Sequence, residues 1–161
     1  MDDSIEGLTR RALFVAGGIG TLALVGLAGA TEAADAPAAA GPEKANVKLV
    51  ETFIKSWSAK DLDAVMHSST FLADDASVRM EEDKPPLIGP AAYAAAFKGF
   101  VSDGSRVKVK ILQTFAKGPV VVNSRVDTVV SAGKPDQVFK VAGVFVVKNG
   151  KIKEWADYLV T

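Results

Sequence analysis

The C-terminal third of the chain alternates apolar and polar residues with a period of two, which predicts β-strands. In the first such segment valine and isoleucine alternate with lysine, and the later ones are rich in valine. Asn149-Gly150, between the last two segments, favours a tight type I′ hairpin turn. The pattern therefore predicts a long antiparallel meander. Its strands are residues 107–111, 120–130, 138–147 and 152–159.

Apolar residues in the preceding region recur at helical spacing instead. The spacing predicts a first helix over residues 44–57 and a second that begins at Asp61, whose carboxylate can cap it. Gly89-Pro90 opens a third helix, over residues 91–100, and residues 76–80 alternate like a short strand. Helices followed by a meander predict one α+β domain in which the helices cover one face of a sheet.

The N-terminus has a different pattern. Arg10-Arg11 precedes an uncharged stretch over residues 12–30, and small residues in an Ala-x-Ala arrangement follow at residues 34–36. This order predicts an export signal of the twin-arginine type over residues 1–36, which would direct the protein to the periplasm. The alternative is an uncleaved membrane anchor, because the uncharged stretch could just span a bilayer. An Ala/Pro/Gly linker, residues 37–43, separates this segment from the domain at 44–161.

Composition narrows the chemistry open to the remaining 125 residues. Removing residues 1–36 changes the net charge from zero to +3, a mild excess spread along the chain, which gives no support to nucleic-acid binding. The chain has no cysteine and a single histidine, so thiolate nucleophiles and cysteine- or histidine-built metal sites are excluded. We expect no metal and no cofactor. Any catalysis must use carboxylates, hydroxyls and arginine.

Three charged residues on two predicted strands are the candidates. Arg125 and Asp127 are two apart and share one strand face, while Asp157 lies between Trp155 and Leu159 on a face of the last strand. A carboxylate between large apolar side chains must be paired or protonated, and Arg125 is the obvious partner. Two carboxylates around one guanidinium could act as acid and base. The alternative is an ordinary Arg125–Asp127 ion pair on a solvated face, with Asp157 independent.

Several short motifs, taken in the order in which they occur along the chain, resemble those of the NTF2-like superfamily. The more specific pair, Arg125-Val126-Asp127 followed by Trp155-Ala156-Asp157-Tyr158, is similar to the limonene-1,2-epoxide hydrolase (SnoaL-like) family from about residue 46 to 161. The shared motifs that say less about chemistry are Phe53-x-x-x-Trp57, Asp61-Leu62-Asp63-Ala64, Ala73-Asp74-Asp75-Ala76, Gly89-Pro90-Ala91-Ala92, Gly143-Val144-Phe145-Val146-Val147 and Asn149-Gly150-Lys151-Ile152.

The resemblance implies a cone-shaped fold, in which N-terminal helices pack on a strongly curved mixed or antiparallel sheet that encloses a pocket. It implies that water attacks an epoxide directly, with Asp127 as the acid, Asp157 as the base and Arg125 bridging them. The expected ligand is a small apolar molecule, and the membrane is met only through the export signal. A homodimer through the outer sheet face is usual for this fold. The expected pocket residues are Trp57, Val78, Met80, Phe139 and Trp155.

One departure from the family pattern bears on function. In that family a tyrosine and an asparagine, two residues apart on an early strand, hold the attacking water. Val78 and Met80 stand at those places here, and neither side chain can hold a water by hydrogen bonds. Two alternatives therefore stay open beside the hydrolase: another acid–base enzyme in the same pocket, such as an isomerase or cyclase, and a binder of small molecules without catalysis.

Overall fold

The structure is a computed structural model that describes residues 41–59, 61–101 and 104–160. The predicted export signal and most of the predicted linker lie outside these residues. The described residues all belong to one compact unit, residues 35–161. Within them, no helix has both the length and the apolar character needed to cross a bilayer.

The helices occupy the N-terminal half of this unit. Helix α1, Gly41–Ser56, begins earlier than predicted and buries Val50, Phe53 and Ile54. Asp61 caps the next helix by accepting a hydrogen bond from the backbone N–H of Asp63, as predicted. The remaining helical elements are α2, Leu62–Met66, the 3-10 helix η1, His67–Phe71, and α3, Gly89–Val101.

The strands form one open, six-stranded sheet in the order β2-β1-β6-β5-β4-β3. Among the strands of the described residues only β1 and β6 pair in parallel, so the sheet is mixed, and the predicted α+β class is confirmed. The strands are β1 Leu72–Arg79, β2 Leu87–Ile88, β3 Arg106–Lys117, β4 Val120–Val130, β5 Gln137–Lys148 and β6 Lys151–Leu159.

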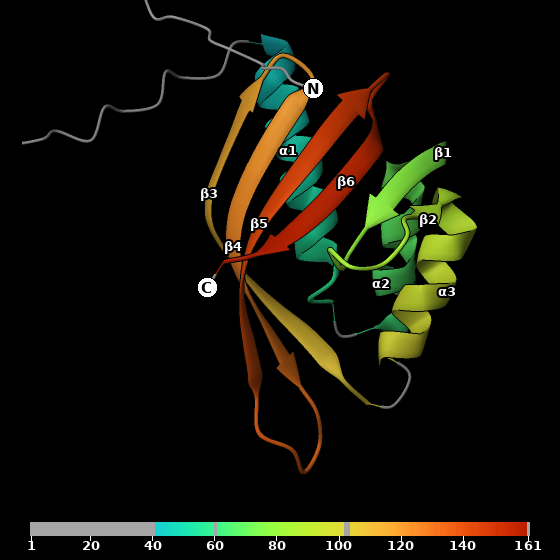
Figure 1. Ribbon diagram of the computed structural model, residues 1–161, viewed down its shortest axis with the longest axis vertical. Helices are drawn as coiled ribbons and strands as arrows, with labels where there is room; N and C mark the ends of the chain where they lie inside the picture. Colours follow the sequence, from blue (N-terminus) through green and yellow to red (C-terminus); the bar gives the residue numbers. More distant parts are fainter. Residues whose placement is uncertain (1–40, 60, 102–103, 161) are drawn as a thin grey trace, which may run out of the picture. The chain divides into compact units, whose positions relative to one another are not determined.

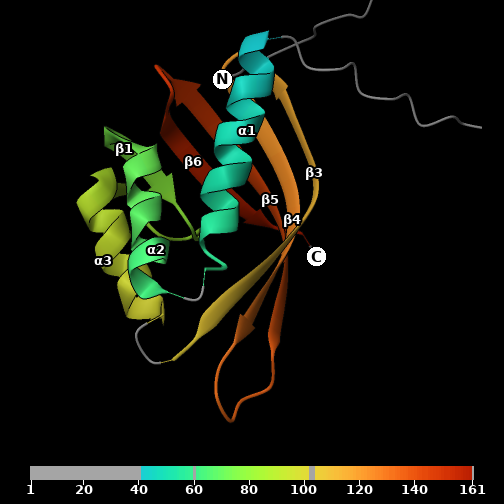
Figure 2. The same cartoon turned by 180° about the vertical axis from the view of Figure 1, so that it is seen from behind.

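The helices all lie on one side of the sheet, and α1 runs across the strands of the meander (Figures 1 and 2). We call the sheet face toward these helices the inner face. The apolar core lies between the two layers. At its centre the ring of Phe53 from α1 meets Trp57, Phe145 from β5 and Trp155 from β6, with ring centroids 5.2 to 6.3 Å apart.

The register of the meander decides which residues meet on the inner face. In β4 the buried residues are Val121, Asn123, Arg125 and Val129, so the odd-numbered side chains point toward the helices. Across the sheet, Asn123 of β4 pairs with Gly143 of β5, which in turn pairs with Asp157 of β6. This row brings Asp157 onto the same face as Arg125, although 32 residues separate them in the chain.

Candidate active site

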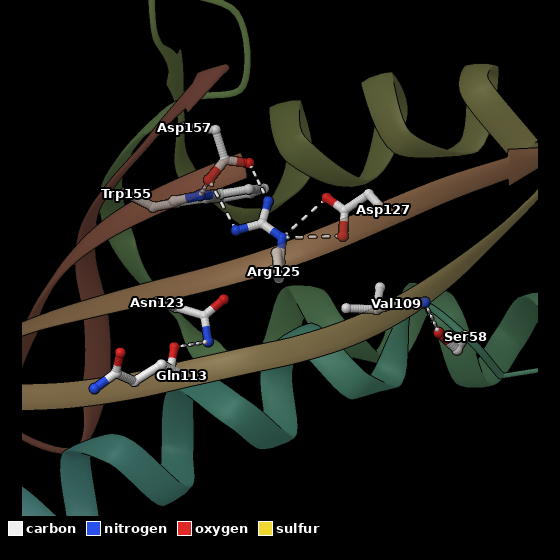
Figure 3. A network of polar contacts seen from close by, with 8 residues as sticks. All are labelled: Ser58, Val109, Gln113, Asn123, Arg125, Asp127, Trp155 and Asp157. Atoms are coloured by element: carbon white, nitrogen blue, oxygen red, sulfur yellow. Dashed lines mark hydrogen bonds and ion pairs between the residues drawn. The ribbon is translucent and has the colours of Figure 1, made fainter. Parts of the chain in front are cut away.

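Arg125 is the centre of the polar cluster on the inner face. Its side chain is 1% exposed, and its Nε donates to both carboxylate oxygens of Asp127, at 3.1 and 2.9 Å. Its other two nitrogens contact Asp157 of β6, which lies on the far side of β5 from β4. Nη1 donates to Oδ1 at 3.2 Å and Nη2 donates to Oδ2 at 2.5 Å (Figure 3). One guanidinium therefore bridges two carboxylates, an arrangement that the sequence left open beside an ordinary Arg125–Asp127 ion pair.

Aromatic side chains enclose this cluster. The guanidinium carbon of Arg125 lies 5.1 Å from the centre of the Trp57 ring, a distance at which a cation is attracted to the ring face. The indole Nε1 of Trp155 donates to Oδ1 of Asp157 at 2.7 Å. Trp155 is itself fixed by the ring of Phe145, which stacks on it at an interplanar angle of 8°. The Asp157 carboxylate thus accepts three hydrogen bonds, from one arginine and one tryptophan.

Burial dominates the ionisation of both acids. It raises the pKa of Asp157 and of Asp127, and the charge and hydrogen bonds of Arg125 offset only part of that rise. Burial also acts to lower the pKa of Arg125, but the two carboxylates outweigh it and raise that pKa instead. Two negative charges around one positive charge leave one in excess, so a proton bound by either acid neutralises the buried cluster.

This arrangement can both donate and accept a proton within one site. The side chains of Asp127 and Asp157 keep 14% and 12% of their surface exposed to solvent, whereas Arg125 is covered. An acid and a base held by a fixed cation are suited to reactions in which a proton is taken at one atom and given at another. Among the described residues, no group of acidic and histidine side chains is placed to hold a metal ion.

The predicted pocket residues lie in three different surroundings. Val78 and Trp155 are buried in the core, and Met80 is half-buried against it. Phe139 is 36% exposed and pairs directly with Asp127 on the inner face of the sheet. Trp57 alone of the five borders a recess of about 200 Å³ in the described part of the chain, between α2, the end of α3 and the start of β3.

Two side chains in the cluster have contacts that the sequence did not indicate. Trp155 was expected as a pocket wall, but its indole N–H fixes Asp157. Asn123 is fully buried beside Arg125, and its amide nitrogen donates to the backbone carbonyl of Gln113 at 3.5 Å (Figure 3). The same nitrogen donates to the Thr114 hydroxyl at 2.7 Å, while Oδ1 of Asn123 has no hydrogen-bond partner in the described part of the chain. The order of residues offered one indication of the position of Asn123: residues 123, 125 and 127 alternate along a strand and therefore share a face. His67 lies apart in η1, where it contacts Thr70 and Phe71.

Comparisons with known proteins find a matching family model and similar folds. A sequence model described as the limonene-1,2-epoxide hydrolase catalytic domain matches residues 44–161. Among solved structures, an LEH-like epoxide hydrolase of M. tuberculosis is 26% identical, with a TM-score of 0.64 over 74% of this chain and 86% of that one. No curated protein matches the chain.

Two more distant structures share the fold. A putative polyketide cyclase of Xanthomonas campestris pv. campestris is 22% identical, with a TM-score of 0.61 over 73% of this chain and 92% of that one. An NTF2-like protein of unknown function from Burkholderia pseudomallei is 16% identical, with a TM-score of 0.59 over 72% and 91%. Together the comparisons support an NTF2-like enzyme or small-molecule binder.

Proposed function

Because the chain belongs to the limonene-1,2-epoxide hydrolase family, we propose that it opens the epoxide of a small, apolar, cyclic or terpenoid-like molecule by direct attack of water. The observation that carries this proposal is the bridge of Asp127 and Asp157 by one buried guanidinium. Epoxide opening needs a proton at the departing oxygen and the loss of a proton from the attacking water. The two carboxyl groups supply one group for each task.

The proposed reaction is a single displacement. Asp157, ionised, accepts a proton from water while the water oxygen bonds to an epoxide carbon. The carbon–oxygen bond of the epoxide breaks, and Asp127, protonated, gives its proton to the departing oxygen. The product is a vicinal diol, and the proton gained by Asp157 must return to Asp127 before the next turnover. Arg125 keeps the two carboxyl groups at fixed positions throughout.

The neighbours of Asp127 favour an apolar substrate. On the inner face Asp127 is flanked by its cross-strand partners Val109 of β3 and Phe139 of β5. An epoxide oxygen that accepts the Asp127 proton would therefore rest between two apolar side chains. Burial of apolar substrate surface against them would contribute about 25 cal/mol per Å² to binding.

The direct test is turnover by the full chain on a panel of apolar cyclic epoxides, with diol formation as the readout. We expect diol from the parent and none above background from Asp157→Asn. Asp75→Asn is the matched control, because it makes the same chemical change on a carboxylate that is 76% exposed. A parent protein that forms no diol from any member of the panel would contradict the proposal.

A second candidate reaction is favoured by Val78 and Met80, which stand where the family pattern has two water-holding residues and whose side chains cannot hydrogen-bond a water. In that reaction the nucleophile is a hydroxyl of the substrate itself, so the epoxide opens by cyclisation and the product is an isomer of the substrate. A hydroxy-epoxide separates the two reactions by mass, since a diol gains one water and a cyclic ether gains none. A protein that binds these compounds and converts none of them would be a binder without catalysis.

We also propose that the protein is exported to the periplasm through a twin-arginine-type signal. Support comes from Arg10-Arg11 ahead of the uncharged residues 12–30. Replacement of both arginines by lysine should leave the protein in the cytoplasm, as measured by cell fractionation. Unchanged delivery to the periplasm would contradict this route.

A further inference from the structure

Gly143 lies in the middle of β5, where a glycine weakens a strand and needs a reason. Backbone conformation is not that reason, because Gly143 is absent from the glycines with positive φ, which are Gly89, Gly104, Gly118, Gly133 and Gly150. An alanine could adopt its extended conformation. The remaining explanation is space, since glycine is the residue that allows another group to approach the backbone closely.

The space above Gly143 is filled by the polar cluster. Gly143 lies in the row between Asn123 and Asp157 on the inner face. A Cβ atom at this position would lie 2.7 Å from Nη1 of Arg125, 2.8 Å from Cε2 of Phe145 and 2.9 Å from Oδ1 of Asp157. All three distances are shorter than a carbon atom accepts without displacing its neighbour.

None of these three groups can move away easily. The Arg125 guanidinium is held by both carboxylates and lies over Trp57. Asp157 is held by Arg125 and by the indole N–H of Trp155. Phe145 is fully buried and stacked on Trp155. By contrast, a Cβ at Gly41 or Gly99 would meet nothing within 4 Å, so close crowding is not general among the glycines of the described region.

We propose that Gly143 is a positioning residue of the active site: its missing side chain leaves the space in which the guanidinium of Arg125 meets the carboxylate of Asp157. The inference deepens the proposed function and rests on it for any effect on turnover. Its geometric content can be tested without a substrate. Gly143 has no side chain that could touch water or epoxide, and it acts only through Arg125 and Asp157.

The experiment compares Gly143→Ala with Ala142→Ser in the full chain. Each change adds one heavy atom to the same strand, but Ala142 points to the opposite face. The first readout is the titration of the Asp157 carboxyl carbon by ¹³C NMR, assigned by its loss in Asp157→Asn. We expect Gly143→Ala to move the midpoint upward, because the ion pair with Arg125 lowers that pKa. We expect kcat to fall by about 10²-fold and Ala142→Ser to change neither quantity.

Two double-mutant cycles separate this role from ordinary core packing. In an Arg125→Lys background the guanidinium fork is gone, so Gly143→Ala should lose most of its effect on the Asp157 midpoint. In a Phe145→Leu background the crowding ring is smaller but the fork remains, so the effect should persist. An effect that persists in the Arg125→Lys background, or that disappears in the Phe145→Leu background, would overturn the proposal.

The remaining outcomes are also decisive. A Gly143→Ala variant with an unchanged midpoint and unchanged turnover refutes the positioning role and leaves the proposed hydrolase standing. A shifted midpoint in a protein that opens no epoxide supports the positioning role and refutes the hydrolase. If Gly143→Ala alone does not fold, the cycles are measured by thermal unfolding. Recovery of folding by Arg125→Lys then supports the proposal, and recovery only by Phe145→Leu contradicts it.

Discussion

The two sides of the site are built differently. On one side, β4 and β6 contribute Arg125, Asp127 and Asp157, whose hydrogen bonds satisfy one another. On the other side, β1 contributes Val78, which is fully buried and pairs with Trp155, and Met80 follows at the end of the strand. The first side can move protons. At the two positions where the family pattern has water-holding residues, the second carries only apolar side chains.

This difference separates two requirements of epoxide opening that are often met together. Transfer of protons needs an acid and a base held near each other, and β4 and β6 provide them. Placement of the nucleophile needs hydrogen-bond partners near the base, and the side chains of Val78 and Met80 cannot act as such partners. We infer that this chain either holds its water less firmly than a site with polar residues on β1, or takes its nucleophile from the substrate.

The largest effect is expected on the charged side. Asp127→Asn and Asp157→Asn should each lower kcat by about 10²–10⁴-fold, because acid and base act in one transition state and neither replaces the other. Stability should fall by only about 1–3 kcal/mol, since the remaining carboxylate still pairs with Arg125. Steady-state kinetics and thermal unfolding measure the two effects. Either variant retaining parental turnover would remove that carboxylate from the mechanism.

A smaller effect, of opposite sign, is expected on the apolar side. Val78→Tyr with Met80→Asn should raise the rate of diol formation by about tenfold, a change of about 1.4 kcal/mol in the barrier. The physical reason is that the new polar groups would hold water near Asp157. Because Val78 is fully buried, the tyrosine should also lower stability by about 1–3 kcal/mol.

Met80→Asn alone is the control for that strain, since Met80 is only half-buried. Rates are compared only between variants with cooperative thermal unfolding. A folded double variant with an unchanged rate of diol formation would show that β1 does not limit the attack of water.

A severalfold change in kcat/KM at acidic pH is expected when the indole N–H of Trp155, on the charged side, is removed. Trp155→Phe removes the hydrogen bond to Oδ1 of Asp157 while keeping a ring to stack on Phe145. The pKa of Asp157 should rise further, because that hydrogen bond lowers it. Since the base must be ionised, the acidic limb of the profile of kcat/KM against pH should move to higher pH. A limb at the parental position would mean that this donor does not tune the base.

The smallest effect compares a buried with an exposed carboxylate through the pH dependence of stability. Burial raises the folded-state pKa of Asp157. The contribution of this carboxyl group to the free energy of unfolding is therefore fully present below its unfolded-state pKa, and it is lost as pH rises through the folded-state pKa. The hydrogen bond and charge of Lys153 lower the folded-state pKa of Asp75. The contribution of Asp75 to the free energy of unfolding is therefore present above its unfolded-state pKa, and it is lost as pH falls through the folded-state pKa.

Thermal unfolding from about pH 3 to 8 tests both signs. The Tm of the parent minus the Tm of Asp157→Asn should be larger at low pH than at neutral pH. For Asp75→Asn the trend should be reversed. The same trend for both variants would show that the cluster does not bind a proton more tightly in the folded state.

The regular elements were largely predictable from the sequence. The bounds of β4 and the Asn149-Gly150 turn agree with the structure, and both turn residues have positive φ, as a type I′ turn requires. β3 runs to Lys117 instead of residue 111 because a register shift between Ile111 and Gln113 breaks the alternation. The two-residue strand β2 is too short to leave a periodic signal.

The site was predictable only in part. Parity placed Arg125 and Asp127 on one face, because a strand fixes that relation locally. Their meeting with Asp157 depends on the register of β4, β5 and β6, which alternation alone does not determine. The space above Gly143 and the indole hydrogen bond of Trp155 depend on side-chain packing between strands, so neither could be read from the order of residues.

The most direct test of water attack on the epoxide is a single turnover of an apolar epoxide by the full chain in H₂¹⁸O. Direct attack of water, with Asp157 as base, predicts that diol formed in the first turnover carries one ¹⁸O and that Asp157 carries none. Unlabelled diol in the first turnover would mean that a protein carboxylate attacked the epoxide, and would contradict the account.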